Sequence, residues 1–187
     1  MSKPPGPRHV RGVFLKFVRE WMAENYGEDF YKNFKTSLTD DQAELLDNVE
    51  RAGWYPADQV FAILEKNIEL VGEENIEKMV RANIQKSVSG FLKGLASFAS
   101  PANLAKRAPA FWKRMYSSGR LQTDKISPKE INVTVYDWKG IRFGCRIIEI
   151  WLEEMISLTG VKKYSIEETH CVFEGDEFCR WKVKILQ

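Results

Sequence analysis

The feature that most constrains this chain is a set of three cysteines and one glutamate near its end. Cys145, Glu168, Cys171 and Cys179 follow the spacing C-x22-E-x2-C-x7-C, and the chain has no other cysteine. Residues 174–176 (Glu-Gly-Asp) have the composition of a tight turn. A hairpin at this turn would place the last two cysteines side by side, where thiolates can share a metal ion. The spacing therefore predicts a metal-stapled C-terminal region.

Zinc is the ion that this donor set favours. Zn²⁺ binds cysteine sulfur and carboxylate oxygen tetrahedrally, so three thiolates and one carboxylate close its shell. A closed shell leaves no position for a catalytic water, and the expected site is structural with no catalytic residue. Fe²⁺ also binds in thiolate-rich sites, and the sequence does not separate the two ions, although ligand softness and availability favour zinc.

Two alternatives to this ligand set stay open. Glu168 and Cys171 are three residues apart, so a regular strand directs them to opposite faces. Both reach one ion only if a bulge or kink lies between them. His170 is a competing fourth ligand in place of Glu168. Free cysteine is also among the most buried residue types, so the three thiols could be ordinary core residues.

Hydrophobic periodicity divides the chain into a helical part and a part rich in strands. Apolar residues at i, i+3 and i+4 predict helices over 10–27, 29–34, 40–52, 57–71, 73–88 and 100–116, and residues 91–98 form a short apolar stretch. Thr39 is the expected N-cap of the third helix, and Pro109 is expected to kink or break the last. Alternation predicts strands over 121–126, 130–138, 161–173 and 178–186, with a helix over 143–158.

This order of elements predicts an α+β fold, with an N-terminal helical layer packed on a small C-terminal antiparallel sheet that has an inserted helix. Residues 1–9 are rich in proline and glycine and are expected to form a disordered tail. Residues 10–187 are expected to form a single ligand-binding-type domain, with a helical part over 10–117 and a sheet-and-metal part over 119–187.

The composition excludes several classes of protein. A chain of 187 residues that is 44% hydrophobic can bury a sizeable core, and its net charge of +2 gives no general case for nucleic acid. No apolar run reaches the ~18 residues that a membrane span requires, and an odd number of cysteines fits a secreted disulfide framework poorly. We therefore expect a cytoplasmic protein without membrane insertion. Serine-nucleophile, phosphate-loop and glycine-rich motifs are missing, so no enzymatic activity is expected.

Aromatic residues make up 12% of the chain, which suits a deep core, an apolar ligand cavity, or both. Six of them are candidates for lining a ligand pocket. They are Trp54, Tyr55, Phe61, Phe111, Trp112 and Tyr116. Ordinary core packing is the alternative role for each.

The residues from Glu168 to Trp181 resemble the end of the 4-vinyl reductase-type small-molecule-binding domain, which includes ligand-sensing domains of aromatic-responsive bacterial transcription activators. The zinc site of those sensors uses a cysteine on or near a helix, then Glu-x-x-Cys, then a cysteine after a glycine-containing turn. Cys145 takes the upstream place here. Residues 10–28, and the order of helices before sheet, resemble the heme–nitric-oxide-binding fold. Residues 100–119 resemble an uncharacterised bacterial family near that fold.

These resemblances imply non-enzymatic binding of a small apolar or aromatic molecule by a sensor or carrier, in a homodimer that signals to another protein. The alternatives are a dimerising protein-interaction module of the same fold, and a reductase-like or heme-binding protein. Heme is disfavoured because the heme sensors use a helix-borne histidine and a Tyr-x-Ser-x-Arg motif. This chain lacks the motif, and neither His9 nor His170 is expected on a central helix. Ligation of heme by cysteine or tyrosine stays open.

Overall fold

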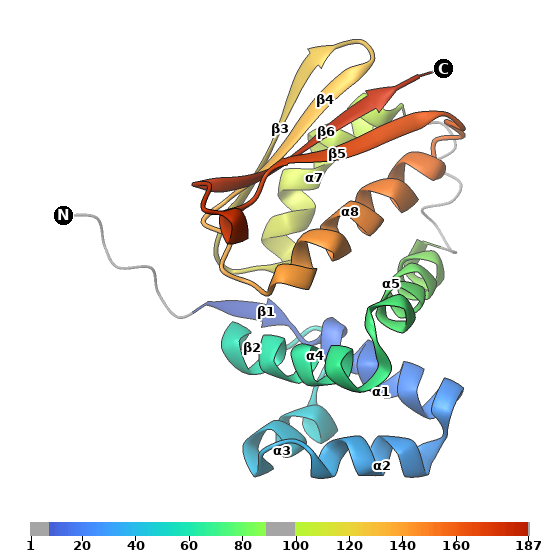
Figure 1. The fold of residues 1–187 in the computed structure, drawn as a ribbon, viewed down its shortest axis with the longest axis vertical. Coiled ribbons are helices and arrows are strands. Elements are labelled where there is room, and N and C mark those ends of the chain that lie inside the picture. Colours follow the sequence, from blue (N-terminus) through green and yellow to red (C-terminus); the bar gives the residue numbers. More distant parts are fainter. Residues whose placement is uncertain (1–7, 89–99, 187) are drawn as a thin grey trace, which may run out of the picture. The chain divides into compact units, whose positions relative to one another are not determined.

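A computed structural model of the protein describes residues 8–88 and 100–186 (Figure 1). The chain divides into two compact units. The first takes in the chain up to residue 79 together with 115–117, and the second takes in 80–114 and everything from 118 onward. Residues 1–7 of the expected tail and the short apolar stretch 91–98 lie outside the described residues. The predicted domain boundaries stay a prediction.

The first unit consists of helices and a two-stranded antiparallel sheet. Its elements are β1 (His9–Arg11), α1 (Val13–Tyr26), α2 (Glu28–Thr36), α3 (Asp40–Asn48), β2 (Trp54–Pro56), α4 (Ala57–Val71) and the first half of α5 (Glu73–Val88). Thr39 caps α3 as predicted: its hydroxyl accepts a hydrogen bond from the Gln42 amide at 3.3 Å, and Gln42 Oε1 accepts one from the Thr39 amide at 3.2 Å.

Residues 9–11 form a strand where the apolar pattern predicts a helix from residue 10. Val10 pairs with Tyr55 in the small sheet, and α1 starts only at Val13. Only glycine fits at position 12, because a Cβ atom there would lie 2.2 Å from the carbonyl oxygen of Glu50. The Gly12 amide donates to the carbonyl of Gly53 at 3.0 Å. The close approach ties the start of α1 to the loop before β2.

One buried tyrosine links α2 to α3. The Tyr31 hydroxyl donates to Asp47 Oδ1 at 3.1 Å, and Lys35 forms an ion pair with the same carboxylate. Burial raises the pKa of Tyr31 to about 12, so the hydroxyl keeps its proton and remains a donor. The hydrogen bond from Lys35 lowers the pKa of Asp47 below its ordinary value. The pair therefore stabilises the folded state only while Asp47 is ionised.

The second unit contains a four-stranded sheet and helices. Its elements are α7 (Pro101–Met115), β3 (Arg120–Ser127), β4 (Glu130–Tyr136), α8 (Arg142–Ser157), β5 (Tyr164–His170), the 3₁₀ turn η1 (Val172–Glu174) and β6 (Phe178–Ile185). The strands are antiparallel in the order β3-β4-β6-β5, and α8 is inserted between β4 and β5. The predicted α+β fold, with a β-β-α-β-β order at its end, is confirmed.

The helix α7 runs through Pro109 without interruption, so the chain does not break there, and the alternative prediction of a kink stays a prediction. Proline has no amide hydrogen, which leaves the carbonyl four residues earlier, that of Ala105, without its helical donor. The Thr123 hydroxyl of β3 donates to this oxygen at 3.0 Å. The sheet thus supplies the hydrogen bond that the proline removes, and the helix continues.

One face of the sheet, which we call the inner face, carries the buried apolar residues. They are Leu121, Ile131, Val133, Val135, Cys179, Trp181 and Val183. Both α7 and α8 lie on this face (Figure 1), through Thr123 to α7 and through Cys179 to α8. No helix of the described residues is long and apolar enough to cross a membrane.

Replacing Asp47 with asparagine should destabilise the first unit at neutral pH and have little effect in acid. A carboxyl whose pKa is lowered by folding contributes stability above its unfolded pKa of about 3.9, and this stability disappears as pH falls through the folded pKa. The melting temperatures of wild type and Asp47→Asn, measured from pH 7 to pH 2, should therefore converge at low pH.

Asp29→Asn is the matched control, because Asp29 pairs with Lys32 at 3.1 Å on an exposed face of α2. An exposed pair of this kind contributes between about 0 and 1 kcal/mol, so its removal should leave the melting temperature nearly unchanged. A gap between wild type and Asp47→Asn that stays constant across this pH range would show that the charge of Asp47 is not the cause.

Candidate metal centre

The start of α8 is held in place within the second unit by close packing of one indole ring. A Cβ atom on Gly144 would lie 2.7 Å from Cζ2 of Trp138, and one on Gly140 would lie 2.1 Å from the same atom. Trp138 is buried and meets the ring of Trp112 edge-on, with centroids 5.6 Å apart. Cys145 directly follows Gly144, so this contact sets the position of its side chain.

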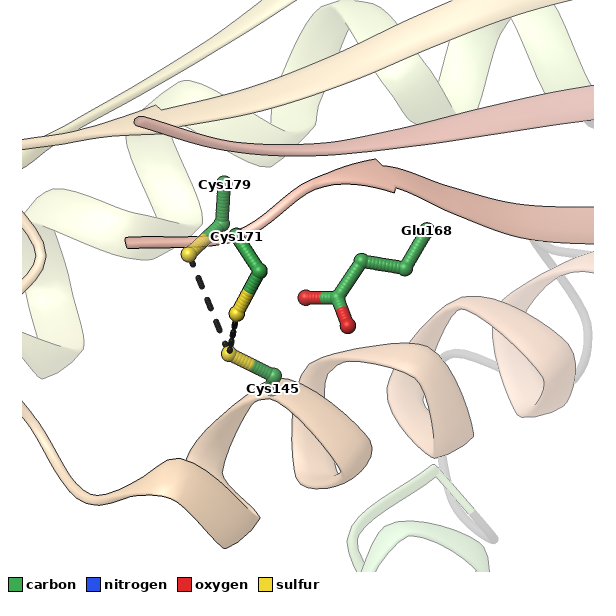
Figure 2. Close-up of side chains that lie close together, drawn as sticks. All are labelled: Cys145, Glu168, Cys171 and Cys179. Atoms are coloured by element: carbon green, nitrogen blue, oxygen red, sulfur yellow. Dashed lines mark hydrogen bonds between the residues drawn. The ribbon is translucent and has the colours of Figure 1, made fainter. Parts of the chain in front are cut away.

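The four residues predicted as ligands lie together in the second unit (Figure 2). Cys145 comes from α8, Glu168 from β5, Cys171 from the residue after β5, and Cys179 from β6. One donor atom from each lies within 4.8 Å of all the others. The thiols are buried, and Figure 2 shows the carboxylate of Glu168 directed toward them. The inserted helix and two strands therefore converge on one point.

The sulfur atoms are spaced as ligands of one ion would be. Cys145 Sγ lies 3.8 Å from Cys171 Sγ and 3.8 Å from Cys179 Sγ. A disulfide would require about 2.05 Å. Two sulfur ligands on a tetrahedral ion, each about 2.3 Å from the metal, lie about 3.8 Å apart. The observed spacing thus matches the edge of a tetrahedron with a metal at its centre.

A register shift resolves the conflict between the positions of Glu168 and Cys171. Glu168 pairs with Trp181 on β6, whereas the next pair is His170 with Arg180, so Thr169 is the extra residue of a β-bulge. This is the bulge that shared ligation requires. It also directs His170 away from the cluster: its ring packs on Phe178, with centroids 4.9 Å apart. Glu168, and not His170, lies with the thiols.

The loop between β5 and β6 is held by hydrogen bonds around Cys171. The Cys171 amide donates to Asp176 Oδ2 at 2.8 Å, and the Cys171 carbonyl accepts from the amide of Glu174 at 2.9 Å. Gly175 adopts φ 100°, in the left-handed region that favours glycine. The Val172 amide donates to Cys179 Sγ at 3.4 Å. The loop is thus a 3₁₀ turn that aims both cysteines at α8.

The hydrogen bond between Cys145 and Cys179 shifts the pKa values of the two thiols in opposite directions. It lowers the pKa of Cys179 to about 7 and raises the pKa of Cys145. Burial raises the pKa of Cys171. A cation at the centre would favour the thiolate form of all three, because a metal-bound thiol is deprotonated.

Arg142 covers the exposed side of the cluster. Its guanidinium lies 3.4 Å from Cys171 Sγ, 3.4 Å from Glu168 Oε2 and 3.3 Å from Glu174 Oε1. The other carboxylate oxygen of Glu168, Oε1, is buried and has no hydrogen-bond partner among the described residues. A buried carboxylate oxygen without a donor is unfavourable, and a bound cation would satisfy it.

The six aromatic residues predicted to line a pocket are distributed over both units. Trp54, Tyr55, Phe61 and Tyr116 belong to the first, and Phe111 and Trp112 to the second. Several have evident structural roles. Tyr55 OH accepts from the Glu50 amide at 2.9 Å, Trp112 Nε1 donates to the Ser118 carbonyl at 3.3 Å, and the exposed Phe111 stacks on Trp151. Their part in a pocket stays a prediction.

Three residues that shape the site were not predicted from sequence. Arg142 lies one turn before Cys145 on α8, and this spacing could have indicated a neighbour of the thiol. Gly144 and Asp176 act through a packing contact and a backbone hydrogen bond. Neither contact leaves a periodic pattern in the sequence.

No family model and no curated protein matches this chain. Solved structures match it in fold. An H-NOX protein from S. oneidensis in the Fe(II)NO ligation state is 10% identical, with a TM-score of 0.69 over 95% of this chain and 100% of that one. An Fe(II) unliganded H-NOX protein from K. algicida is 8% identical, with a TM-score of 0.65 over 95% and 97%. A structure from work on heme distortion in the H-NOX family is 18% identical, with a TM-score of 0.65 over 95% and 96%.

These comparisons confirm the heme–nitric-oxide-binding-like fold and correct two other predictions. They do not support the resemblance to the 4-vinyl reductase-type domain. The prediction of zinc as cofactor is wrong, because the solved structures of this fold are described by heme and Fe(II). Thiolate and carboxylate donors select a class of ions, so the cluster alone does not identify zinc. The four ligand residues themselves stay a prediction.

Replacing Gly144 with alanine should destabilise the second unit and displace Cys145. The added methyl would meet the Trp138 indole at 2.7 Å, and overpacking of this kind costs about 1–3 kcal/mol. Thermal unfolding, together with the rate at which a disulfide reagent modifies the thiols in the folded protein, measures both effects. The variant should melt lower and react faster.

Ser157→Ala, in the exposed last turn of the same helix, is the control and should behave as wild type. Alanine has a higher helix propensity than glycine by about 1 kcal/mol. If packing on Trp138 did not matter, Gly144→Ala would therefore be more stable than wild type, and that result would contradict the role assigned to the indole.

Proposed function

We propose that this chain is a non-enzymatic domain of H-NOX-like fold that binds a small apolar molecule, as a sensor or a carrier. The observation that carries the proposal is the likeness to H-NOX structures, which extends over 95% of the chain. One H-NOX structure is described in an Fe(II)NO ligation state, and another structure in an Fe(II)CO ligation state. A fold hosts many functions, so the proposal depends on direct detection of a ligand. A homodimer and a signalling partner stay predictions.

Heme held by a helix-borne histidine does not fit the residues of this chain. The sequence has two histidines, and they lie in β1 (His9) and β5 (His170). The three cysteines lie with Glu168 in a cluster whose donor atoms are within 4.8 Å of one another, which is room for a single ion and not for a porphyrin. We therefore propose an apolar ligand other than histidine-ligated heme.

We also propose that Cys145, Glu168, Cys171 and Cys179 bind one metal ion that fastens α8 to β5 and β6. The sulfur spacing of 3.8 Å and the unpartnered Oε1 atom of Glu168 support this proposal. Four protein donors complete a tetrahedral shell, so the role of the ion is structural. Its binding free energy adds to folding because the unfolded chain does not hold the ligands together.

Elemental analysis of the purified, untagged protein should find about one first-row transition metal ion per chain. Cys171→Ser should lose most of this metal. It should also lose about 2 kcal/mol or more of stability, equivalent to a melting temperature about 4–8 °C lower for a chain of this size. Plasma mass spectrometry and thermal unfolding measure the two effects.

His170→Ala is the matched control. His170 is next to Cys171 in the sequence but faces away from the cluster, so its replacement should leave the metal content unchanged. A Cys171→Ser protein that keeps its metal and its stability would refute the four-residue site. Loss of metal from His170→Ala, with retention in Glu168→Gln, would instead identify histidine as the fourth ligand.

Organic extraction of the native protein, followed by mass spectrometry, should recover a small apolar molecule. The extract of an unrelated protein from the same host is the control for carried-over lipid. The absorption spectrum should lack an intense heme band near 400 nm, because no helix-borne histidine is present to ligate the iron. An empty extract, with no change in melting temperature on adding a panel of aromatic compounds, would overturn the binding function; a stoichiometric heme would overturn the choice of ligand.

A further inference from the structure

The face of the sheet opposite α7 and α8, which we call the outer face, separates its charges along the strands. At one end Asp124, Glu130 and Glu167 occupy outer positions together with Lys182 and Lys184. Lys182 pairs with Glu130 at 3.4 Å. This half therefore contains three acidic and two basic outer positions, with one ion pair between them.

The other half of the outer face carries cations without carboxylates. Arg120 on β3 is opposite Tyr136 on β4, and Tyr136 is opposite Phe178 on β6. Arg180 is opposite His170 on β5. No acidic residue occupies the outer positions of the strands at these pairs. Two arginines and one histidine therefore share one end of the sheet, which we call the arginine end.

Both arginines lie over aromatic rings. The guanidinium of Arg120 lies 4.3 Å from the ring centroid of Tyr136, and that of Arg180 lies 4.6 Å from the ring centroid of Phe178. The two rings are themselves 5.5 Å apart. Arg180 Nε also donates to Thr134 Oγ1 at 3.0 Å, and Arg120 donates to Gln122 Oε1 at 2.9 Å. The side chains are thus ordered before any partner arrives.

Neither arginine is neutralised. Among the described residues, neither Arg120 nor Arg180 forms an ion pair. Arg51, Arg81, Arg142 and Arg146, in contrast, each pair with a carboxylate. A guanidinium has five N–H donors, and the neutral acceptors found here use only one in each residue. Oriented guanidinium groups with unused donors recognise carboxylate and phosphate oxygens, often by two parallel hydrogen bonds.

We propose that the arginine end of the outer face binds an acidic segment of a partner protein, with its carboxylates on Arg120 and Arg180. Charge complementarity favours this occupant over a nucleic acid. Single-stranded nucleic acid binds by stacking its bases on free aromatic faces, whereas arginine side chains cover the rings of Tyr136 and Phe178. The carboxylates of the other half of the sheet would also repel a long polyanion, but they leave room for a short acidic segment.

The interaction uses none of the four predicted metal ligands and does not rest on the proposed ligand binding. It does depend on the bulge at Thr169, because the register shift there places His170 beside Arg180 on the outer face. The surface therefore has its own test, and its failure would leave the metal site and the ligand proposal unaffected.

Fluorescence anisotropy of a labelled oligoglutamate peptide, titrated with the full chain, tests the proposal. We expect saturable binding that an oligoglutamine peptide does not show. Arg120→Gln should weaken binding by about tenfold, and the double variant Arg120→Gln with Arg180→Gln by more, since each removes charge-assisted hydrogen bonds. Arg120 is exposed, so its single variant is expected to fold even if loss of Arg180 from Thr134 and Phe178 destabilises the sheet.

The double variant Lys182→Gln with Lys184→Gln is the matched control, because it removes the same charge from the same face at the half that also carries carboxylates. It should change the affinity by less than about twofold, as expected for rim charges. Absence of peptide binding by wild type would overturn the proposal, as would equal weakening by the lysine variants. Tighter binding of a labelled oligothymidylate, with the same dependence on Arg120, would replace the acidic protein segment with nucleic acid.

Discussion

The register shift between Glu168 and His170 is the constraint on which both faces of the sheet depend. In a regular strand, Glu168 and Cys171 would point to opposite faces, and a metal could not reach both. The extra residue, Thr169, lets the carboxylate and the thiol face α8 together while His170 turns outward beside Arg180. The Thr169 hydroxyl donates to the Arg180 carbonyl at 3.3 Å, which fastens the bulge to β6. One inserted residue therefore sets the ligand cluster and the charge pattern behind it.

The cluster in turn explains why the start of α8 is packed so closely. Three buried thiols with a carboxylate beside them repel one another once they ionise, and only a cation or retained protons can balance them. Arg142 supplies a positive charge from the solvent side, and within the cluster it contacts Glu168 and Cys171. Cys145 has to approach from the helix, and the indole of Trp138 against Gly144 fixes that approach. Packing and electrostatics thus act on the same backbone segment.

The sequence was sufficient for features that repeat along the chain or depend on local spacing. The Cys-x22-Glu-x2-Cys-x7-Cys spacing predicted that the three cysteines meet, with Glu168 or His170 as the fourth member, and alternation around Val133 predicted β4. Features that depend on a distant partner could not be predicted. Val10 lies in a strand because Gly12 approaches Glu50, and α7 passes Pro109 because Thr123 reaches Ala105. The stacking of Arg120 on Tyr136 likewise requires the β3–β4 register, which no propensity encodes.

The difference between features with a local sequence pattern and features that depend on particular side chains also explains how this chain relates to the H-NOX structures. A fold of this kind is specified by apolar periodicity, turn positions and strand register, and these persist at 10% identity. A bound heme makes one further demand, an axial donor on an element that faces the iron. This chain retains the fold while its two histidines lie on strands and its cysteines lie in a cluster of their own. The proposed binding of an apolar molecule needs shaped apolar surface and no axial donor, so it is compatible with this arrangement of histidines and cysteines.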